Sequence, residues 1–272
     1  MLNKLLDIIY SKEDGIASIT INRPERMNSL RNRTFLEIIE ALLDAWGDKS
    51  VGVIVLTGAG DRAFCTGGDQ GERGLGGYVE EDEKVISGIT NLDILQSHSL
   101  VINLIKGIPK PIIAAVNGYA IGAGHAMHLA CDLSIAADHA RFGQTGAKVG
   151  SFDVGASALL ARIVGPKKAR EIWYLCRQYS AQEALELGMV NKVVPKEKLQ
   201  EEVNTWCREL LSKSPTALGF LKVAFNADAD GIAGVAAMSE LAVDLYYEGE
   251  ESMEGRNAFM EKRAPDFSKF RK

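Results

Sequence analysis

The stretch PIIAAVNGYAIGAGHAMHLACDLSIAA, residues 111–137, contains the pattern that decides the fold. PIIAAV and LSIAA are short apolar runs, typical of strands that are buried on both faces of a sheet. Between them, a glycine-rich turn leads into a short apolar helix. A strand, a turn, a helix and a second strand in this order indicate an α/β core with parallel pairing.

The same alternation extends outward from this stretch. Residues 7–24, DIIYSKEDGIASITINRP, predict two strands around a Glu-Asp-Gly turn, and VGVIVLTG at 51–58 predicts a buried strand. Between them, residues 29–48 place apolar side chains at helical spacing, namely Phe35, Ile38, Ile39, Leu42 and Leu43. After about Ser180 the pattern becomes almost wholly helical. The sequence therefore predicts an α/β core followed by a helical C-terminal layer.

Composition excludes several classes of function. The chain has 272 residues, 46% of them apolar and 25% charged, which is ordinary for a soluble globular protein. A net charge of −5 gives no general affinity for nucleic acid or acidic membranes, and no run approaches the ~18 apolar residues of a membrane span. The N-terminal apolar run is too short for a signal peptide. The four cysteines lack CxxC spacing, which disfavours a zinc site and fits reduced thiols in a cytoplasmic protein; they are Cys65, Cys131, Cys176 and Cys207.

Two glycine-rich turns each follow a predicted strand. AFCTGGDQ spans residues 63–70, and GYAIGAGH spans residues 118–125. Each turn can direct backbone N–H groups past a strand end, and two such donors at one point would form an oxyanion hole. The same residues are also compatible with two ordinary tight turns, and spacing alone does not separate the two interpretations.

A third polar segment, RFGQTGAKVGSFD at residues 141–153, lies between apolar segments and predicts a loop across the core. It offers a hydroxyl, a carboxylate and an amide, which either serve chemistry or hold a turn together. Residues 71–88 are glycine-rich and then acidic, which suits a mobile loop or lid. His125 and His128 lie one helical turn apart with no third ligand nearby, which favours a core pair over a metal site.

The ordered set NRPERMNSL, AFCTGGD, PKPIIAAVNGYAIGAG and CDLSIAADHARFGQ resembles the crotonase (enoyl-CoA hydratase/isomerase) superfamily. The resemblance implies a crotonase fold: stacked ββα turns over residues 1–200 and a helical C-terminal trimerisation region over residues 201–272. It implies a coenzyme A thioester as substrate, with its carbonyl between the N–H groups of Gly68 and Ala123. It implies no metal and no cofactor beyond the coenzyme A of the substrate, and a homo-oligomer that is a trimer or a dimer of trimers.

Hydratases of this superfamily use two glutamates, whose positions match Ala126 and Gly146 here. Neither residue can carry a proton, so the resemblance implies chemistry other than hydration. FGQTGAKVGSFD, the segment from LARIVG to GMVN, and EGRNAFMEKRAPDFSKF look like one branch of the superfamily. That branch contains 1,4-dihydroxy-2-naphthoyl-CoA synthase, which closes a ring, and 2-oxocyclohexanecarboxyl-CoA hydrolase, which opens one. Both reactions pass through a thioester enolate.

This branch implies specific roles for individual residues. Ser151, Asp153 and Tyr247 match catalytic positions, with Asp153 as a candidate base. A pocket that holds bicarbonate as the base in many synthases matches Gln144, Thr145, Gly146 and Trp173. Further substrate-binding positions are Tyr78 on the predicted lid, Arg26, Asp69 and Lys262, the last near the coenzyme A phosphates. Each has a structural alternative: propensity alone favours a core position for Trp173, and Tyr247 lies in a predicted amphipathic helix whose core it would also fit.

Departures from the synthase pattern favour the hydrolase. The chain reads GSFDVGASALL, where synthases usually read GSFDGG followed by an aromatic residue. Met27 and Gly71 stand where synthases often have basic residues. The intact GQTG favours the synthase instead. A different class stays open, a crotonase-fold scaffold or RNA-binding subunit, although the acidic net charge argues against RNA.

Overall fold

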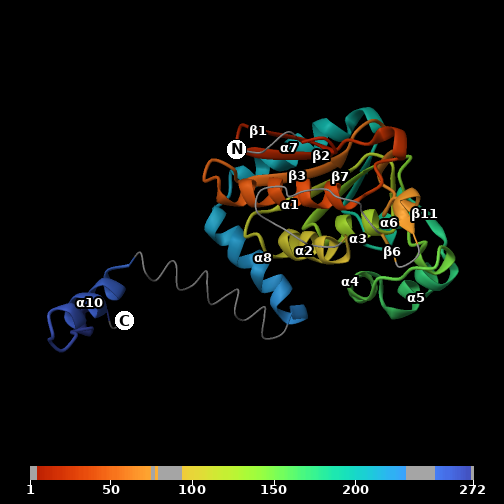
Figure 1. The fold of residues 1–272 in the computed structure, drawn as a ribbon. Helices are drawn as coiled ribbons and strands as arrows, with labels where there is room; N and C mark the ends of the chain where they lie inside the picture. The colour runs from red at the N-terminus through yellow and green to blue at the C-terminus, as the bar shows by residue number, and fades with distance from the viewer. Residues whose placement is uncertain (1–4, 75–76, 79–93, 231–248, 271–272) are drawn as a thin grey trace. The chain divides into compact units, whose positions relative to one another are not determined.

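The computed structural model describes residues 5–74, 77–78, 94–230 and 249–270 (Figure 1). These form two compact units, Met1–Gly219 and Phe220–Lys272. The first contains every strand described below. The second contains the C-terminal part of helix α8 (Pro215–Asp230), helix α10 (Glu250–Met260) and a short 3-10 helix. The boundary predicted at residue 200 stays a prediction.

The chain begins with the expected hairpin. Strands β1 (Ile8–Glu13) and β2 (Ile16–Ile21) pair antiparallel. Asp14 and Gly15, the two residues between them, have φ angles of 49° and 81°. Positive φ at both positions is what a two-residue type I′ turn requires, and Asp-Gly supplies it at low steric cost. Helix α1 (Asn32–Gly47) follows, and it buries the predicted apolar face except for Leu43.

A six-stranded sheet forms the centre of the first unit. Its strand order is β1-β2-β3-β7-β9-β12, and all neighbours except β1 and β2 are parallel. The added strands are β3 (Val53–Gly58), β7 (Ile112–Val116), β9 (Leu133–Ala137) and β12 (Lys192–Val194). Three of the predicted buried strands are therefore confirmed as β3, β7 and β9.

A four-stranded sheet contains the short strands that follow those of the large sheet. Its order is β11-β10-β8-β4. Strands β4 (Ala63–Cys65), β8 (Tyr119–Ile121) and β10 (Arg141–Gly143) run parallel, and β11 (Gln178–Ser180) pairs antiparallel with β10. Three successive turns of the chain, which begin with β3, β7 and β9, each place one strand in each sheet before the next long helix. This arrangement confirms the predicted α/β fold of stacked ββα turns.

The remaining elements complete the described residues. The helices are α2 (Ile94–Gly107), α3 (Ala123–Ala130), α4 (Val154–Val164), α5 (Pro166–Leu175), α6 (Ala181–Glu186) and α7 (Leu199–Leu211). Two short strands, β5 (Arg73–Gly74) and β6 (Gly77–Tyr78), pair with each other. The 3-10 helices are Pro24–Arg26, Gln70–Glu72, Gly146–Lys148, Lys196–Lys198 and Ser268–Phe270. No helix among the described residues is long and apolar enough to cross a membrane.

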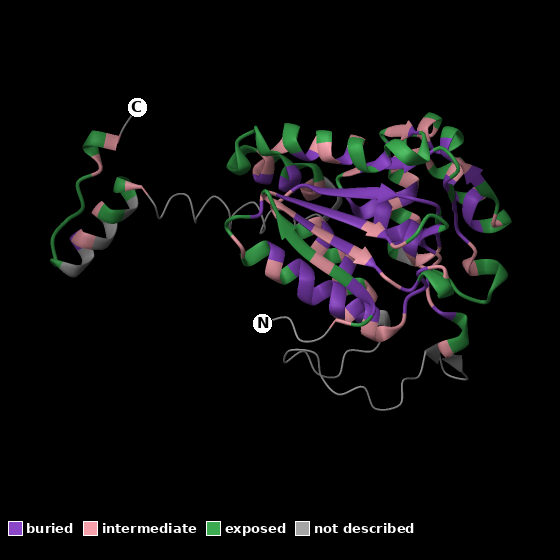
Figure 2. Cartoon of the chain, turned by 90° about the horizontal axis from the view of Figure 1, so that it is seen from above, coloured by how far each residue is buried: buried purple, intermediate pink, exposed green. Residues whose placement is uncertain are grey.

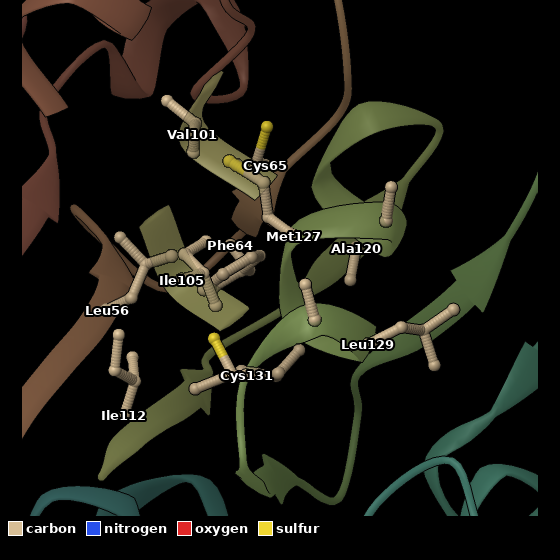
Figure 3. Close-up of a cluster of buried hydrophobic side chains, with 14 of the residues drawn as sticks. Leu56, Phe64, Cys65, Val101, Ile105, Ile112, Ala120, Met127, Leu129 and Cys131 are labelled. Atoms are coloured by element: carbon tan, nitrogen blue, oxygen red, sulfur yellow. The ribbon is translucent and has the colours of Figure 1, made fainter. Parts of the chain in front are cut away.

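The central strands β3, β7 and β9 of the large sheet are buried on both faces (Figure 2). Side chains alternate along β3, so Val53 and Val55 belong to the cluster that α7 covers. Ile54 and Leu56 belong to the main core on the other face, which α1 covers (Figure 1). Figure 3 shows that main core where β3, β7, α2 and α3 meet. A strand buried on both faces needs a continuous apolar run, as the sequence has.

Several short strands differ from the sequence-based expectation. The region after Ser180 was expected to be almost wholly helical, but β12 pairs with β9 at the edge of the large sheet. The first three residues of the expected loop 141–153 form β10, and the two glycine-rich turns contain β4 and β8. Each of these strands is only three residues long. Their pairing depends on partners distant in sequence, so local pattern carries little signal for them.

Glycine at position 124 is a steric requirement of this packing. A Cβ atom at Gly124 would lie 2.2 Å from the Cys65 carbonyl oxygen and 2.7 Å from the Cys65 Cβ. We expect Gly124→Ala to lower the free energy of unfolding by about 1–3 kcal/mol, the usual effect of overpacking a core. Urea unfolding measures this change.

Gly47→Ala is the matched control. Gly47 is exposed in α1, and a Cβ there would have no neighbour within 4 Å. Alanine should raise the stability by up to about 1 kcal/mol, because glycine is a poor helix former. Equal stability of the two variants would contradict the steric assignment.

Candidate active site

Two backbone turns meet at the ends of neighbouring strands in the small sheet. Strand β4 leads into Thr66–Asp69, and β8 leads into Gly122 at the start of α3. Gly67 and Gly122 have φ angles of 86° and 58°, a region that favours glycine. A Cβ atom at Gly67 would lie 3.2 Å from the Ala123 nitrogen, so the two turns are in contact.

The backbone N–H groups of Gly68 and Ala123 donate no hydrogen bond within the described residues. Both residues line one cavity. Ala123 is also the first residue of α3, where the helix dipole adds partial positive charge. Two free donors beside a cavity form the arrangement that stabilises a developing oxyanion. The methyl group of Ala123 causes no backbone strain, since the positive φ falls on Gly122 instead.

An ion pair holds the first turn in place. The Arg23 guanidinium donates to Asp69 Oδ2 at 2.9 Å and to the Ser29 carbonyl at 2.6 Å. Leu30 binds the turn on both sides of Gly68: its N–H donates to the Gly67 carbonyl, and its own carbonyl accepts from the Asp69 N–H. Burial alone would raise the pKa of Asp69, but the Gly71 N–H and Arg23 together hold it below the ordinary value. Asp69 therefore stays ionised as a brace for the turn.

Gln144 holds the second turn. Its side chain is buried, and its Nε2 donates to the Gly122 carbonyl at 3.3 Å. The Gly122 N–H donates to the Gly143 carbonyl at 3.1 Å. Gln144 also lines the cavity, so it both positions the turn before Ala123 and offers an amide to a ligand.

The segment that follows folds back over the cavity. The Ser151 N–H donates to the Gly146 carbonyl at 2.8 Å. Asp153 is the N-cap of α4, and its Oδ1 accepts from the Ala156 N–H at 2.8 Å. Ser151 and Asp153 both line the cavity, as does Trp173 of α5. The Trp173 Nε1 is buried without a hydrogen-bond partner among the described residues.

His98 of α2 is a site residue that the sequence did not indicate. Its Nε2 lies 3.8 Å from Asp153 Oδ2, is buried and has no hydrogen-bond partner among the described residues. Burial lowers the pKa of His98, and the Asp153 carboxylate opposes this shift. Nothing in the surrounding sequence, SHSL, marks this histidine as functional. Only the packing of α2 against α1 and α3 brings it near Asp153.

The structure brings eight of the thirteen predicted site residues together around this cavity. They are Gly68, Ala123, Gln144, Thr145, Gly146, Ser151, Asp153 and Trp173. Asp69 lies behind the first turn, and Arg26 is exposed in the 3-10 helix Pro24–Arg26. The backbone of Tyr78 lies in β6. The functional roles of all these residues stay predictions.

The other predicted positions are not placed beside the cavity. Lys262 lies in the second unit, and Tyr247 lies outside the described residues, as does most of the predicted lid.

His125 and His128 are fully buried, and His128 Nε2 lies 2.9 Å from His125 Nδ1. Burial lowers the pKa of His125 to about 3. Among the described residues, no three or more His, Cys, Asp or Glu side chains form a group suited to a metal ion.

The two positions matched to hydratase glutamates lie near this site. Gly146 lines the main cavity. Ala126, in α3, lines a neighbouring cleft of about 380 Å³ between α2 and α4. His98, Phe152 and Asp153 line both spaces. Among the described residues that line these two spaces, Asp153 is the one carboxylate and His98 the one imidazole, and neither stands at a position matched to a hydratase glutamate.

The comparisons with known proteins agree with this geometry. Residues 11–270 match the family model described as enoyl-CoA hydratase/isomerase. A structure described as an enoyl-CoA hydratase subunit I from Geobacillus kaustophilus HTA426 is 32% identical, with a TM-score of 0.74, covering 97% of this chain and 98% of that one. An enoyl-CoA hydratase from Bacillus anthracis is 29% identical, with a TM-score of 0.73 and coverage of 96% and 98%.

The ion pair behind the first turn generates a test of stability. Asp69→Asn keeps an acceptor for the Gly71 N–H but leaves the buried Arg23 with a weaker partner. We expect the free energy of unfolding at neutral pH to fall by at least about 2 kcal/mol, because one partner of a buried pair is removed. Urea unfolding of both proteins measures the difference.

The difference in free energy of unfolding between wild type and Asp69→Asn should become smaller at low pH. A lowered folded-state pKa means that Asp69 contributes its stability fully above the ordinary value of 3.8 and loses it as the pH falls through the folded pKa. The gap between wild type and variant should therefore narrow below pH 3.8. Asp61→Asn, which removes an exposed pair with Lys196, is the control and should change stability little. If the difference in stability between wild type and Asp69→Asn stays constant with pH, the ionised Asp69 carboxylate does not stabilise the turn.

Proposed function

The chain belongs to the enoyl-CoA hydratase/isomerase family, and on that premise we propose that it opens the ring of a cyclic β-oxoacyl-CoA by hydrolysis. Residues 11–270 carry the family match. The observation that supports this reaction is the composition of the cavity. Gly68 and Ala123, whose N–H groups have no partner among the described residues, line a cavity, and there is no glutamate at either hydratase position. A carboxylate, Asp153, stands on the same cavity instead.

The oxyanion donors fit an enolate reaction. The thioester oxygen would accept hydrogen bonds from the N–H groups of Gly68 and Ala123. Water attacks the ring ketone, with Asp153 or a bound bicarbonate as the base. The tetrahedral adduct then breaks its bond to the α-carbon, and the electron pair of that bond becomes the thioester enolate. Ser151 or Tyr247 returns a proton to the α-carbon.

Ring closure by the naphthoyl-CoA synthase reaction is the second candidate. The observation that favours it is the pocket beside Gly146. Trp173 has a buried Nε1 without a partner among the described residues, and the GQTG segment lines the same cavity. A bicarbonate ion at this place would accept from the indole N–H, and such a base is needed for the condensation. Arg26, Tyr78 and Lys262 would bind substrate in either reaction.

The assembly and the compartment are proposed on the same basis. We infer a homo-oligomer, a trimer or a dimer of trimers, in the cytoplasm. No nucleic-acid or membrane partner is proposed, given the net charge of −5.

Three thioesters separate the candidate reactions. Purified enzyme is incubated with 2-oxocyclohexanecarboxyl-CoA, o-succinylbenzoyl-CoA or crotonyl-CoA, and the thioester products are identified by mass. We expect ring opening of the first, with a mass gain of one water. We expect no useful hydration of crotonyl-CoA, because each missing acid–base group typically contributes about 10²–10⁴-fold. Ring closure of o-succinylbenzoyl-CoA alone would support the synthase, and rapid hydration of crotonyl-CoA would overturn both proposals.

Asp153→Asn tests the proposed base. Asparagine caps a helix about as well as aspartate, so α4 and the melting temperature should be preserved. The variant lacks the negative charge and basicity, and we expect kcat to fall roughly 10²-fold or more with thioester affinity retained. Circular dichroism, titration with coenzyme A thioester and turnover are measured on one preparation.

Ser180→Ala is the matched control, because Ser180 caps α6 and does not line the cavity. Losing that cap should reduce stability by about 1 kcal/mol without changing kcat. Near-normal turnover in Asp153→Asn would leave Asp153 with its capping role alone.

A further inference from the structure

The imidazole of His98 has no role in the reaction as set out above, although it stands at the centre of the site. It lines both the main cavity and the α2/α4 cleft. Only 18% of its side chain is exposed, and its Nε2 is buried without a hydrogen-bond partner among the described residues. A buried polar atom without a partner carries a substantial energetic penalty. A ligand or a water molecule that reaches Nε2 would remove that penalty.

The side chains of His98 and Asp153 are each held by other residues, independently of each other. Ser97, the neighbour of His98, is fully buried, and its hydroxyl donates to Asn32 Oδ1 of α1 at 2.8 Å. The ring of Phe35, also in α1, contacts the His98 ring edge-on, with 5.5 Å between centroids. Asp153 is fixed through Oδ1, which caps α4. The imidazole and the second carboxylate oxygen therefore face each other across a preset gap.

The gap itself is informative. At 3.8 Å, His98 Nε2 and Asp153 Oδ2 are too far apart for a direct hydrogen bond, yet close enough for a strong charge interaction. At this separation the carboxylate stabilises a positive charge on the imidazole, while neither group satisfies the other through a hydrogen bond.

We propose that His98 is the general base that removes a proton from the attacking water, and that Asp153 stabilises the imidazolium that results. The inference deepens the proposed ring opening and rests on it. It changes the role of Asp153 from base to charge partner. The assignment stands on the position of His98 beside Gly68, Ala123 and Asp153 on one cavity.

The ring opening begins with deprotonation of the attacking water. His98 Nε2 takes one proton from water, and the hydroxide oxygen forms a bond to the ring ketone carbon, giving an alkoxide. The alkoxide electron pair re-forms the carbonyl, and the bond between that carbon and the α-carbon breaks. Its electron pair moves onto the thioester as an enolate, held at Gly68 and Ala123. The α-carbon then takes the proton from the imidazolium, and the new carboxylic acid ionises in water.

The protonation state of His98 suits a base. Burial lowers the pKa of His98 below 6.5, so the ring is neutral at neutral pH and can accept a proton. Among the described residues, Asp153 on α4 is the charged group that faces it, and Phe35 on α1 is uncharged. Lys106, on the same helix, lines only the α2/α4 cleft. Asp153 opposes the effect of burial, which keeps the imidazolium accessible as an intermediate.

His98→Gln tests the proposal, with 2-oxocyclohexanecarboxyl-CoA as substrate and cyclohexanecarboxyl-CoA, which cannot open, as the binding probe. We expect kcat to fall by about 10²-fold or more, with the Kd of the probe changed by less than about threefold. His139→Gln is the matched control, because His139 lies outside both cavities and has a side chain 40% exposed. It should leave both quantities unchanged.

His98→Ala provides a second test through chemical rescue. The vacated space joins the main cavity to the α2/α4 cleft, so added imidazole has room to enter. Imidazole should restore turnover, and pyrazole, a ring of the same size but much weaker basicity, should not. This test also serves if the glutamine variant does not fold.

Failure of the proposed ring opening and failure of the role proposed for His98 give different results. If the wild-type enzyme does not open the ring, the proposed function is wrong and this inference with it. If the wild type opens the ring and His98→Gln retains kcat within about threefold, or pyrazole rescues as well as imidazole, this inference alone is wrong.

Discussion

The close approach of two backbone turns is the constraint on which the candidate site depends. Strands β4 and β8 are parallel neighbours, with Cys65 opposite Ala120, so their carboxyl ends lie at the same edge of the small sheet. The residues that follow them are therefore brought together by the sheet itself. Contact is possible only because glycine stands at 67 and 124, where a Cβ would press on the Ala123 nitrogen or the Cys65 carbonyl. The donors are backbone atoms, so the side chain at position 123 can vary without loss of the N–H.

Sequence pattern predicted the parts of the fold that are encoded locally. The Asp14–Gly15 turn and the apolar face of α1 are specified by adjacent residues, and both were predicted. The three-residue strands β4, β8, β10 and β12 were missed, because such a strand has too few residues to show alternation and exists only through its partner. The same distinction applies to the site. The glycine-rich turns left an oxyanion hole and ordinary tight turns equally open, and the resemblance to the superfamily implied Gly68 and Ala123 as donors. His98 depends on where α2 packs, which neither the turns nor the resemblance indicates.

Asp153 shows why the loop 141–153 was ambiguous from sequence. In one interpretation, the side chains of Ser151 and Asp153 stabilise a turn. In the other, they take part in the reaction. In the structure, Oδ1 caps α4, and Oδ2 lies 3.8 Å from His98 Nε2 and is not used by the cap. A capping bond restrains the carboxylate at low conformational cost, which is what a positioned charge needs. A structural role and a chemical role are therefore compatible in the same side chain.

The glycine at position 146 determines how the loop that leads to Asp153 is placed. A Cβ at Gly146 would lie 2.7 Å from the Ser151 carbonyl oxygen, and the Ser151 N–H donates back to the Gly146 carbonyl. The loop can close over the cavity in this way only if position 146 has no side chain. That closure directs the chain into α4 with Asp153 at its first turn. A glutamate at 146 and the present position of Asp153 are thus sterically incompatible. Gly146 and Asp153 therefore stand at opposite ends of one loop, and Oδ2 of Asp153 lies 3.8 Å from the Nε2 of a histidine on α2.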